Sequence, residues 1–178
     1  MPRKTSNFVR VDRDFYPTPY KAVIPLLAHL PDNTSFVEPC AGDGRLSDHL
    51  NKHGHIPYFL GDIWPERNDI TQCDATIITT PYMGADCIIT NPPWDRDVLY
   101  PMIEHFRKFS PAWLLLPAPL MHTKKAAPYM AYCAKIVSVG RVKWIEESKG
   151  SGTQDAAWYL FEQAPCQTIF YGAALCGK

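Results

Sequence analysis

The chain has 178 residues, with 18 Lys and Arg against 18 Asp and Glu, so its formal net charge is zero. This balance excludes a protein that holds nucleic acid through a globally cationic surface. Hydrophobic residues make up 46% of the chain and charged residues 20%, which is typical of a folded globular protein and not of a disordered one.

The length predicts one domain spanning residues 1–178, in which residues 1–18 form an N-terminal arm and residues 163–178 a C-terminal tail. The longest apolar runs are shorter than the ~20 residues that a membrane-spanning helix requires. The first residues also lack the apolar core of a signal peptide. We therefore expect a soluble, cytoplasmic protein with no membrane partner.

Cysteine and histidine spacing gives no sign of a disulfide framework or a metal site. The six cysteines are widely spaced and include no Cys-x-x-Cys pair, so reduced thiols are expected. His49 and His53 share one face of a predicted helix, but no third ligand has suitable spacing. We expect no bound metal.

Stretches with helical spacing alternate along the chain with short apolar, β-branched runs. The predicted helices cover residues 19–30, 45–53, 98–109 and 123–135. The predicted strands cover residues 35–38, 57–62, 75–79, 86–90, 112–116, 136–145 and 157–162. Alternating strands and helices that end in a hairpin indicate an α/β fold with a mostly parallel sheet, one antiparallel strand and helices on both faces.

A glycine turn follows the first predicted strand, which ends at Glu38. Gly42-Asp43-Gly44 lets a ligand approach the backbone closely, and Asp62 ends the next strand, where ligands of α/β sheets bind. Ser47 replaces the third glycine of a dinucleotide fingerprint, and Asp43 would repel a pyrophosphate, so NAD is disfavoured. The acids favour a cationic, ribose-containing ligand. A tight turn that binds no ligand is the alternative.

The second motif is Asn91-Pro-Pro-Trp94, directly after an apolar strand. The two prolines remove two N–H donors, and Asn91 is driven to an extended conformation because it precedes Pro92. The Asn91 side-chain oxygen and the Pro92 carbonyl then remain as acceptors for a planar amino group, beside the ring of Trp94. The alternative is a proline-rich connection with Trp94 in the core. The glycine turn and the two strand-end acids favour the functional interpretation.

Together these motifs resemble those of class I S-adenosylmethionine-dependent methyltransferases. Within that family they resemble DNA adenine-N6 methyltransferases of gamma-like motif order, in the small form common among phage and prophage products. Asp14-Phe-Tyr-Pro-Thr-Pro19 is similar to the motif that precedes the core, Phe36–Gly44 to the cofactor loop and Asn91–Trp94 to the catalytic motif. The resemblance covers most of the chain. It implies a Rossmann-like methyltransferase fold with a seven-stranded sheet and S-adenosyl-L-methionine as cofactor.

The same resemblance implies which residues form the site. The residues expected to bind the cofactor are Tyr16, Pro17, Thr18, Glu38, Pro39, Cys40, Ala41, Gly42, Gly44, Asp62, Ile63, Asp74 and Asn91. The residues expected to be catalytic are Asn91, Pro92, Pro93 and Trp94. The residues expected to bind the substrate are Trp94, Lys149, Asp155 and Trp158.

The implied reaction is methyl transfer to the exocyclic N6 amino group of adenine in DNA, in the cytoplasm of a bacterial or phage-infected cell. Methylation of an RNA base or of a protein glutamine amide is an alternative, as is a non-catalytic methyltransferase-like module that binds nucleic acid. Nucleic acid is the expected partner, with DNA ahead of RNA. No separate target-recognition domain follows the catalytic motif, so a homodimer or a partner subunit could supply target recognition.

Charge is unevenly distributed along the chain. Residues 1–21 carry five basic and two acidic side chains, residues 22–104 carry four and twelve, and residues 105–178 carry nine and four. The acidic middle suits a sulfonium ligand, and the basic ends could face phosphates around Trp94.

Overall fold

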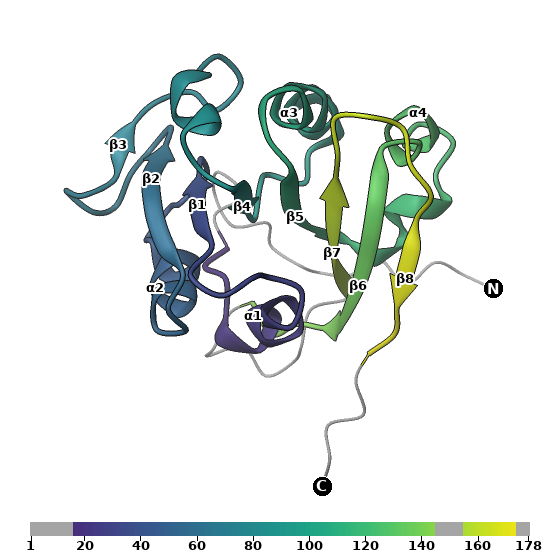
Figure 1. Ribbon diagram of the computed structural model, residues 1–178, viewed down its shortest axis with the longest axis horizontal. Coiled ribbons are helices and arrows are strands. Elements are labelled where there is room, and N and C mark those ends of the chain that lie inside the picture. Colours follow the sequence, from purple (N-terminus) through teal and green to yellow (C-terminus); the bar gives the residue numbers. More distant parts are fainter. Residues whose placement is uncertain (1–15, 145–154, 174–178) are drawn as a thin grey trace, which may run out of the picture.

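The computed structural model describes residues 16–144 and 155–173, which form one eight-stranded sheet (Figure 1). The strand order is β3-β2-β1-β4-β5-β7-β6-β8. The strands in chain order are β1 (Ser35–Glu38), β2 (Ile56–Asp62), β3 (Thr71–Gln72), β4 (Cys87–Thr90), β5 (Ala112–Pro117), β6 (Cys133–Arg141), β7 (Asp155–Phe161) and β8 (Ile169–Tyr171). β7 is antiparallel to β5 and β6, and the other pairings are parallel, which confirms the predicted single antiparallel strand.

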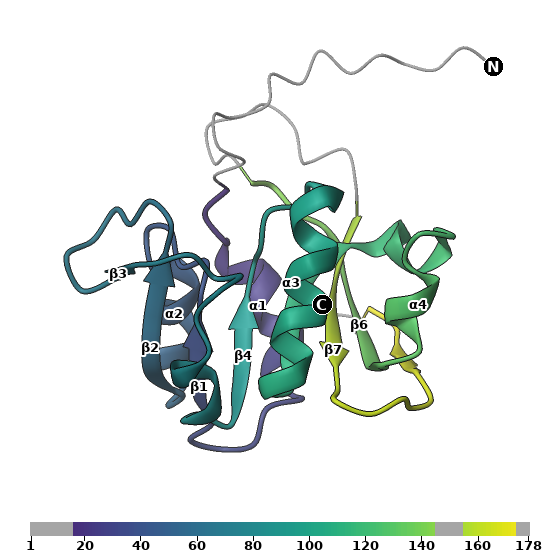
Figure 2. The same cartoon turned by 90° about the horizontal axis from the view of Figure 1, so that it is seen from above.

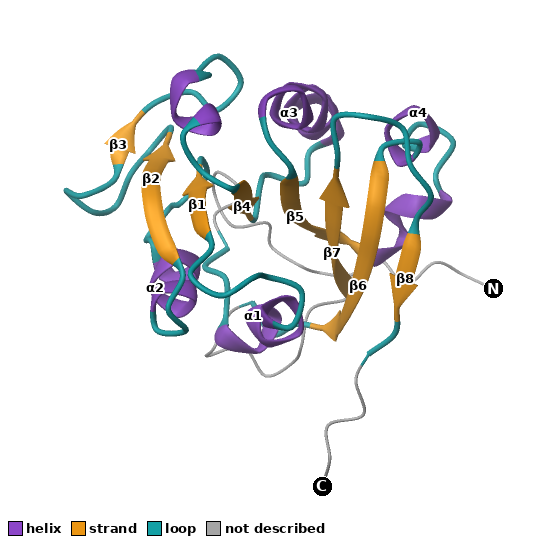
Figure 3. Ribbon diagram, viewed as in Figure 1, coloured by secondary structure: helices purple, strands orange, loops and turns teal. Residues whose placement is uncertain are grey.

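Helices cover both faces of the sheet (Figure 3). They are α1 (Tyr20–Leu27), α2 (Arg45–Asn51), α3 (Arg96–Phe109) and α4 (Ala127–Met130), with short 3-10 turns η2 (Thr80–Met83) and η3 (Ala118–His122). α1 and α2 lie on one face, and α3 and α4 on the other. The side chain of Asp95 caps α3 by accepting a hydrogen bond from the backbone N–H of Asp97 at 3.0 Å.

The core consists of two apolar layers, one on each face of the sheet. Successive residues of a strand point to opposite faces, so Phe36 contributes to the layer under α1 and α2, and Val37 to the layer under α3. Ile88 and Ile89 of β4 divide in the same way. Because helices cover both faces, the central strands are apolar at nearly every position, as expected for a doubly covered sheet.

Three predictions about elements were wrong. Residues 75–79 form a turn and no strand, because the Asp74 carboxylate accepts hydrogen bonds from the backbone N–H and hydroxyl of Thr76. The helix predicted over residues 123–135 is reduced to α4, because the chain from Cys133 onward pairs with β7. The sheet has eight strands instead of seven, because β3 takes the place of the strand expected at residues 75–79, and part of the predicted C-terminal tail forms β8, which pairs with β6.

Across residues 16–144 and 155–173, no helix has the length and apolar character needed to cross a bilayer.

Candidate functional site

The carboxyl ends of three neighbouring parallel strands bring the two sequence motifs to one edge of the sheet. β1 ends at Glu38 and pairs with β2, which ends at Asp62, and with β4, which ends at Thr90. The arrowheads of β2 and β4 point to the same edge in Figure 2. The glycine turn and the Asn91–Trp94 loop therefore start side by side, as in other α/β ligand sites.

The glycine turn is hydrogen-bonded to the end of β2. Gly42 donates its backbone N–H to Asp62 Oδ2 at 2.8 Å, and Trp64 donates its N–H to Asp62 Oδ1 at 2.7 Å. Gly42 and Gly44 both adopt positive φ, +54° and +76°, a conformation that favours glycine. Each Asp62 oxygen keeps further lone pairs for a ligand after accepting one backbone N–H.

Glu38 is an acid enclosed at the end of β1. Its side chain is 2% exposed, and Oε2 has no hydrogen-bond partner among the described residues. Burial raises its pKa well above the usual range, and a hydrogen bond with the Ser47 backbone opposes this only in part. A buried carboxyl oxygen without a partner needs an explanation, and a bound ligand with a donor group is one.

The remaining predicted cofactor residues line the neighbouring loops. Cys40 and Ala41 lie in the turn, where burial raises the pKa of the Cys40 thiol, so this thiol stays protonated. Ile63 follows Asp62 and is 54% exposed. Asp74 uses Oδ1 to accept the two Thr76 hydrogen bonds, at 2.8 and 2.7 Å, and these lower its pKa.

A polar junction joins the N-terminal motif to the Asn-Pro-Pro-Trp loop. The Asn91 Nδ2 atom donates to the Thr18 hydroxyl oxygen at 3.2 Å and to the Tyr16 backbone carbonyl at 3.3 Å. Thr18 is 4% exposed, whereas Asn91 and Tyr16 are partly buried, so the junction is partly shielded from water. Both N–H groups of the Asn91 side-chain amide are engaged there. The Asn91 side-chain oxygen is then the atom that can accept a hydrogen bond from another group. The structure thus brings together two motifs that are more than seventy residues apart in the sequence.

Trp94 is held by two contacts. Its indole N–H donates to the Leu115 carbonyl at 3.0 Å, and its ring meets Trp144 at 5.4 Å between centroids and 87° between planes. Trp144 also makes an edge contact with Tyr16, at 6.3 Å between centroids. We identify Trp144 as a residue of this site that no sequence motif marks, because only the end of β6 brings it beside Trp94.

The other residues predicted to bind the substrate are Trp158, Asp155 and Lys149. Trp158 on β7 is fully buried in the core and donates its indole N–H to the Ala22 carbonyl at 2.7 Å, so it has no exposed surface for a substrate. This placement corrects its predicted role. Asp155 is exposed at the start of β7 and forms an ion pair with Arg141 at 3.2 Å. Lys149 lies outside the described residues.

The four predicted site prolines lie next to these polar groups. Pro39 and Pro92 are buried, and Pro17 and Pro93 are partly buried.

Among the described residues there is no group of three or more His, Cys, Asp or Glu side chains suited to a metal ion. His49 and His53 instead contact Tyr20, whose hydroxyl is 2.8 Å from His53 Nε2.

No protein-family model matches the chain, and no curated protein matches it either. The described fold does match solved structures. A type I restriction-modification system methyltransferase subunit from Streptococcus thermophilus aligns with a TM-score of 0.58 and 11% identity, over 88% of this chain and 47% of that one. This chain therefore spans about half the length of that subunit.

Two other solved structures match over most of both chains. A TehB-like SAM-dependent methyltransferase from Corynebacterium glutamicum aligns with a TM-score of 0.51 and 14% identity, over 82% of this chain and 88% of that one. The 23S rRNA methyltransferase ErmE aligns with a TM-score of 0.53 and 12% identity, over 85% of this chain and 71% of that one. The strand order and these alignments together show that the chain has the Rossmann-like class I methyltransferase fold.

Proposed function

We propose that the chain is an S-adenosylmethionine-dependent N-methyltransferase acting on the exocyclic N6 amino group of adenine in DNA. The observation that carries this proposal is the partly buried junction of Asn91 with Thr18 and Tyr16, which engages the N–H groups of the Asn91 side-chain amide and leaves its oxygen to accept from a substrate amino group. The methyltransferase fold supports it, because both motifs occupy the strand ends where that fold binds its ligands.

The residues around the turn fit S-adenosylmethionine. The buried, unpartnered oxygen of Glu38 suits an amino group at the methionine end, and Asp62 at the end of β2 suits the ribose hydroxyls. Asp74, with one oxygen engaged by Thr76, would hold the adenine end, and Tyr16 and Thr18 would border the methionine end. When bound, the cofactor supplies a methyl group on a sulfonium sulfur. Acidic side chains favour such a cation, whereas they would repel a phosphate.

The chain's own residues would position the acceptor nitrogen. An exocyclic amino nitrogen is a poor nucleophile because its lone pair is delocalised into the ring. Hydrogen bonds from its two N–H groups to the Asn91 side-chain oxygen and the Pro92 carbonyl would favour a pyramidal nitrogen with a localised lone pair. Catalysis would then come largely from proximity and orientation.

Two features support nucleic acid as the substrate. An adenine in duplex DNA must leave the base stack, which costs a few kcal/mol, and the fixed ring of Trp94 offers stacking in return. Four exposed basic residues, Lys124, Lys125, Arg141 and Lys143, follow η3 or lie at the end of β6. Since β5 and β6 are both antiparallel to β7, their ends lie at the same edge as Asn91, where phosphates could be bound.

Methyl transfer from tritiated S-adenosylmethionine to DNA, RNA and bacterial lysate tests the proposal, with N6-methyladenine identified by mass spectrometry. We expect label in DNA as N6-methyladenine, and roughly a hundredfold less with Asn91→Ala, because the acceptor nitrogen would no longer be positioned. Asn51→Ala, an exposed asparagine at the end of α2, is the matched control and should retain activity.

Each other outcome contradicts part of the proposal. Equal labelling of DNA by the wild type and by Asn91→Ala would refute the role of Asn91. Label confined to RNA or to protein would replace DNA by one of those substrates. Cofactor binding without transfer to any of the three would favour a non-catalytic module.

A further inference from the structure

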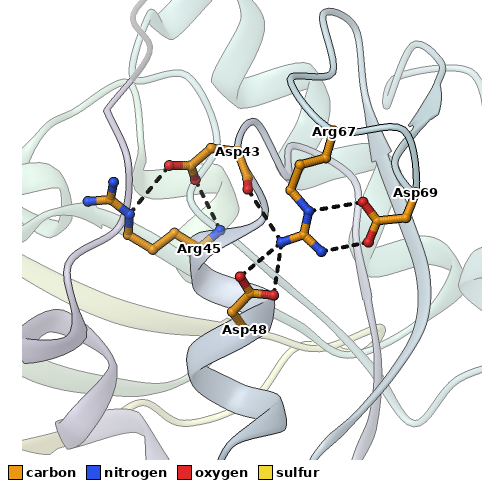
Figure 4. A network of polar contacts seen from close by, with 5 residues as sticks. All are labelled: Asp43, Arg45, Asp48, Arg67 and Asp69. Carbon is orange, nitrogen blue, oxygen red and sulfur yellow. Dashed lines mark hydrogen bonds and ion pairs between the residues drawn. The ribbon is translucent and has the colours of Figure 1, made fainter.

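Arg67, which belongs to no sequence motif, connects the loop between β2 and β3 to the glycine turn. We propose that Arg67 is a positioning residue for cofactor binding, because it holds this loop against the turn and thereby fixes Gly42 and Asp62. This inference rests on the proposed cofactor. Figure 4 shows the network of polar contacts around Arg67.

The Arg67 guanidinium binds two carboxylates at once. Nε and Nη2 donate to the two oxygens of Asp69 at 2.9 and 2.5 Å, and Nη1 is 2.9 Å from each oxygen of Asp48. Nη1 also lies 3.5 Å from the backbone carbonyl oxygen of Asp43. Asp43 belongs to the turn, Asp48 to α2 and Asp69 to the loop, so one side chain joins three segments. Bidentate pairing of this kind fixes geometry as well as charge.

The guanidinium also packs directly on Gly44. A Cβ atom at this position would overlap Nη1 of Arg67 and lie 2.8 Å from its Cζ. Gly44 therefore meets two requirements, the positive φ of +76° and the space that Arg67 occupies. The absence of a side chain at Gly44 is what lets the arginine reach Asp48.

The same loop is also hydrogen-bonded to the turn through its backbone. Glu66 donates its N–H to the Gly42 carbonyl at 3.1 Å, while Gly42 donates its own N–H to Asp62. Gly42 is thus held on one side by the end of β2 and on the other by the loop that Arg67 anchors. Releasing the loop would free one side of Gly42 and, through Trp64, loosen the Asp62 carboxylate.

Electrostatics adds to the expected effect. Without Arg67, the carboxylates of Asp48 and Asp69 would lose the positive charge that lies between them, and their repulsion would push the loop away from α2 and the turn. The hydrogen bonds to Asp69 and Asp48 raise the pKa of Arg67, so it remains charged. The side chain is about one-third exposed, so its contribution to global stability is small. Its loss should therefore affect cofactor affinity more than folding.

Calorimetric titration with S-adenosylmethionine at 25 °C, together with thermal melting of the ligand-free protein, tests this inference. We expect Arg67→Ala to raise the Kd about tenfold, with a small change in melting temperature. Arg67→Lys keeps the charge but cannot bind both carboxylates in fork geometry, so its Kd should rise by a smaller factor. Lys108→Ala removes an exposed ion pair with Glu104 on α3, away from the turn, and serves as the matched control with unchanged Kd.

The outcomes separate this inference from the proposed function. If the wild type binds S-adenosylmethionine and Arg67→Ala binds it equally well, the positioning role of Arg67 is refuted while the cofactor stands. If the wild type does not bind at all, the proposed function fails and the inference fails with it. Should Arg67→Ala not fold, Arg67→Lys decides, because an unchanged Kd there would also refute the role.

Discussion

Replacing Thr18 by Val should slow methyl transfer without preventing folding. Valine has the shape of threonine but lacks the hydroxyl oxygen that accepts from Asn91 Nδ2 at 3.2 Å. A neutral hydrogen bond of this kind contributes about 0.5–1.5 kcal/mol. If the bond serves to orient the Asn91 side-chain oxygen, its loss raises the activation barrier by that amount, which corresponds to about a twofold to twelvefold lower rate.

Single-turnover methylation of duplex DNA at saturating S-adenosylmethionine measures this effect on the chemical step. Thr18→Ser, which keeps the hydroxyl, is the matched control and should react close to the wild-type rate. A Thr18→Val rate equal to that of the wild type would refute the orienting role of the junction. An equal loss in Thr18→Ser would also refute it, because the hydroxyl would then not be the group that matters.

Three further substitutions test the acids that end β1 and β2, and the core tryptophan. Burial raises the pKa of Glu38 in the folded protein. The protonated form therefore contributes its full stability at low pH, and this contribution is lost as the pH rises through the folded-state pKa. Glu38→Gln should therefore raise the free energy of unfolding near pH 8, with a gain that shrinks toward pH 4, as measured by urea denaturation; an equal gain at both pH values would contradict this. Asp62→Ala leaves the N–H groups of Gly42 and Trp64 without their acceptor. The Kd for S-adenosylmethionine, measured by calorimetry, should rise about tenfold to a hundredfold. An unchanged Kd would exclude the role of Asp62 in binding the ribose hydroxyls. Trp158→Phe removes the buried hydrogen bond to Ala22 and should lower the free energy of unfolding, measured in urea, by about 1–3 kcal/mol. DNA methylation should not change. Slower methylation by the folded variant would support the predicted role of Trp158 in substrate binding.

The parts of the fold that the sequence predicts are those with a strong local signal. The strand-turn-helix unit from Ser35 to Asn51 is marked by an apolar run, two glycines and an amphipathic stretch. The helix predicted over residues 98–109 is α3, which begins two residues earlier, at Arg96, behind the Asp95 cap. In each case the side chains near the element are enough to determine it.

The wrong predictions arise where a distant partner or a turn overrides local preference. Residues 75–79 are rich in β-branched side chains, but the Asp74 carboxylate stabilises a turn there instead. Residues 133–135 have helical spacing, yet pairing with β7, more than twenty residues later, places them in a strand. β3 and β8 have two and three residues, too few for any periodicity to be detected.

The site shows the same division between local and distant information. The glycine turn and the Asn91–Trp94 loop are contiguous motifs, so their positions at strand ends follow from the sequence. Trp158 was misassigned because β7 lies between two strands and under helices on both faces, so exposure does not alternate along it. Trp144 and Arg67 belong to no motif, and their roles come only from the way that loops meet in three dimensions.

The position of β7 has a consequence for the order in which the protein is completed during synthesis. β5 and β6 do not neighbour each other in the sheet, and β7 joins them, although it comes after both in the chain. Until residues 155–161 leave the ribosome, one edge of β5 has no strand to pair with, and that strand is buried at five of its six positions in the finished protein. The nascent chain therefore carries an exposed apolar strand edge, of the kind that pairs with other chains, through the synthesis of more than thirty residues. β7 thus joins β5 to β6 and removes the exposed edge of β5.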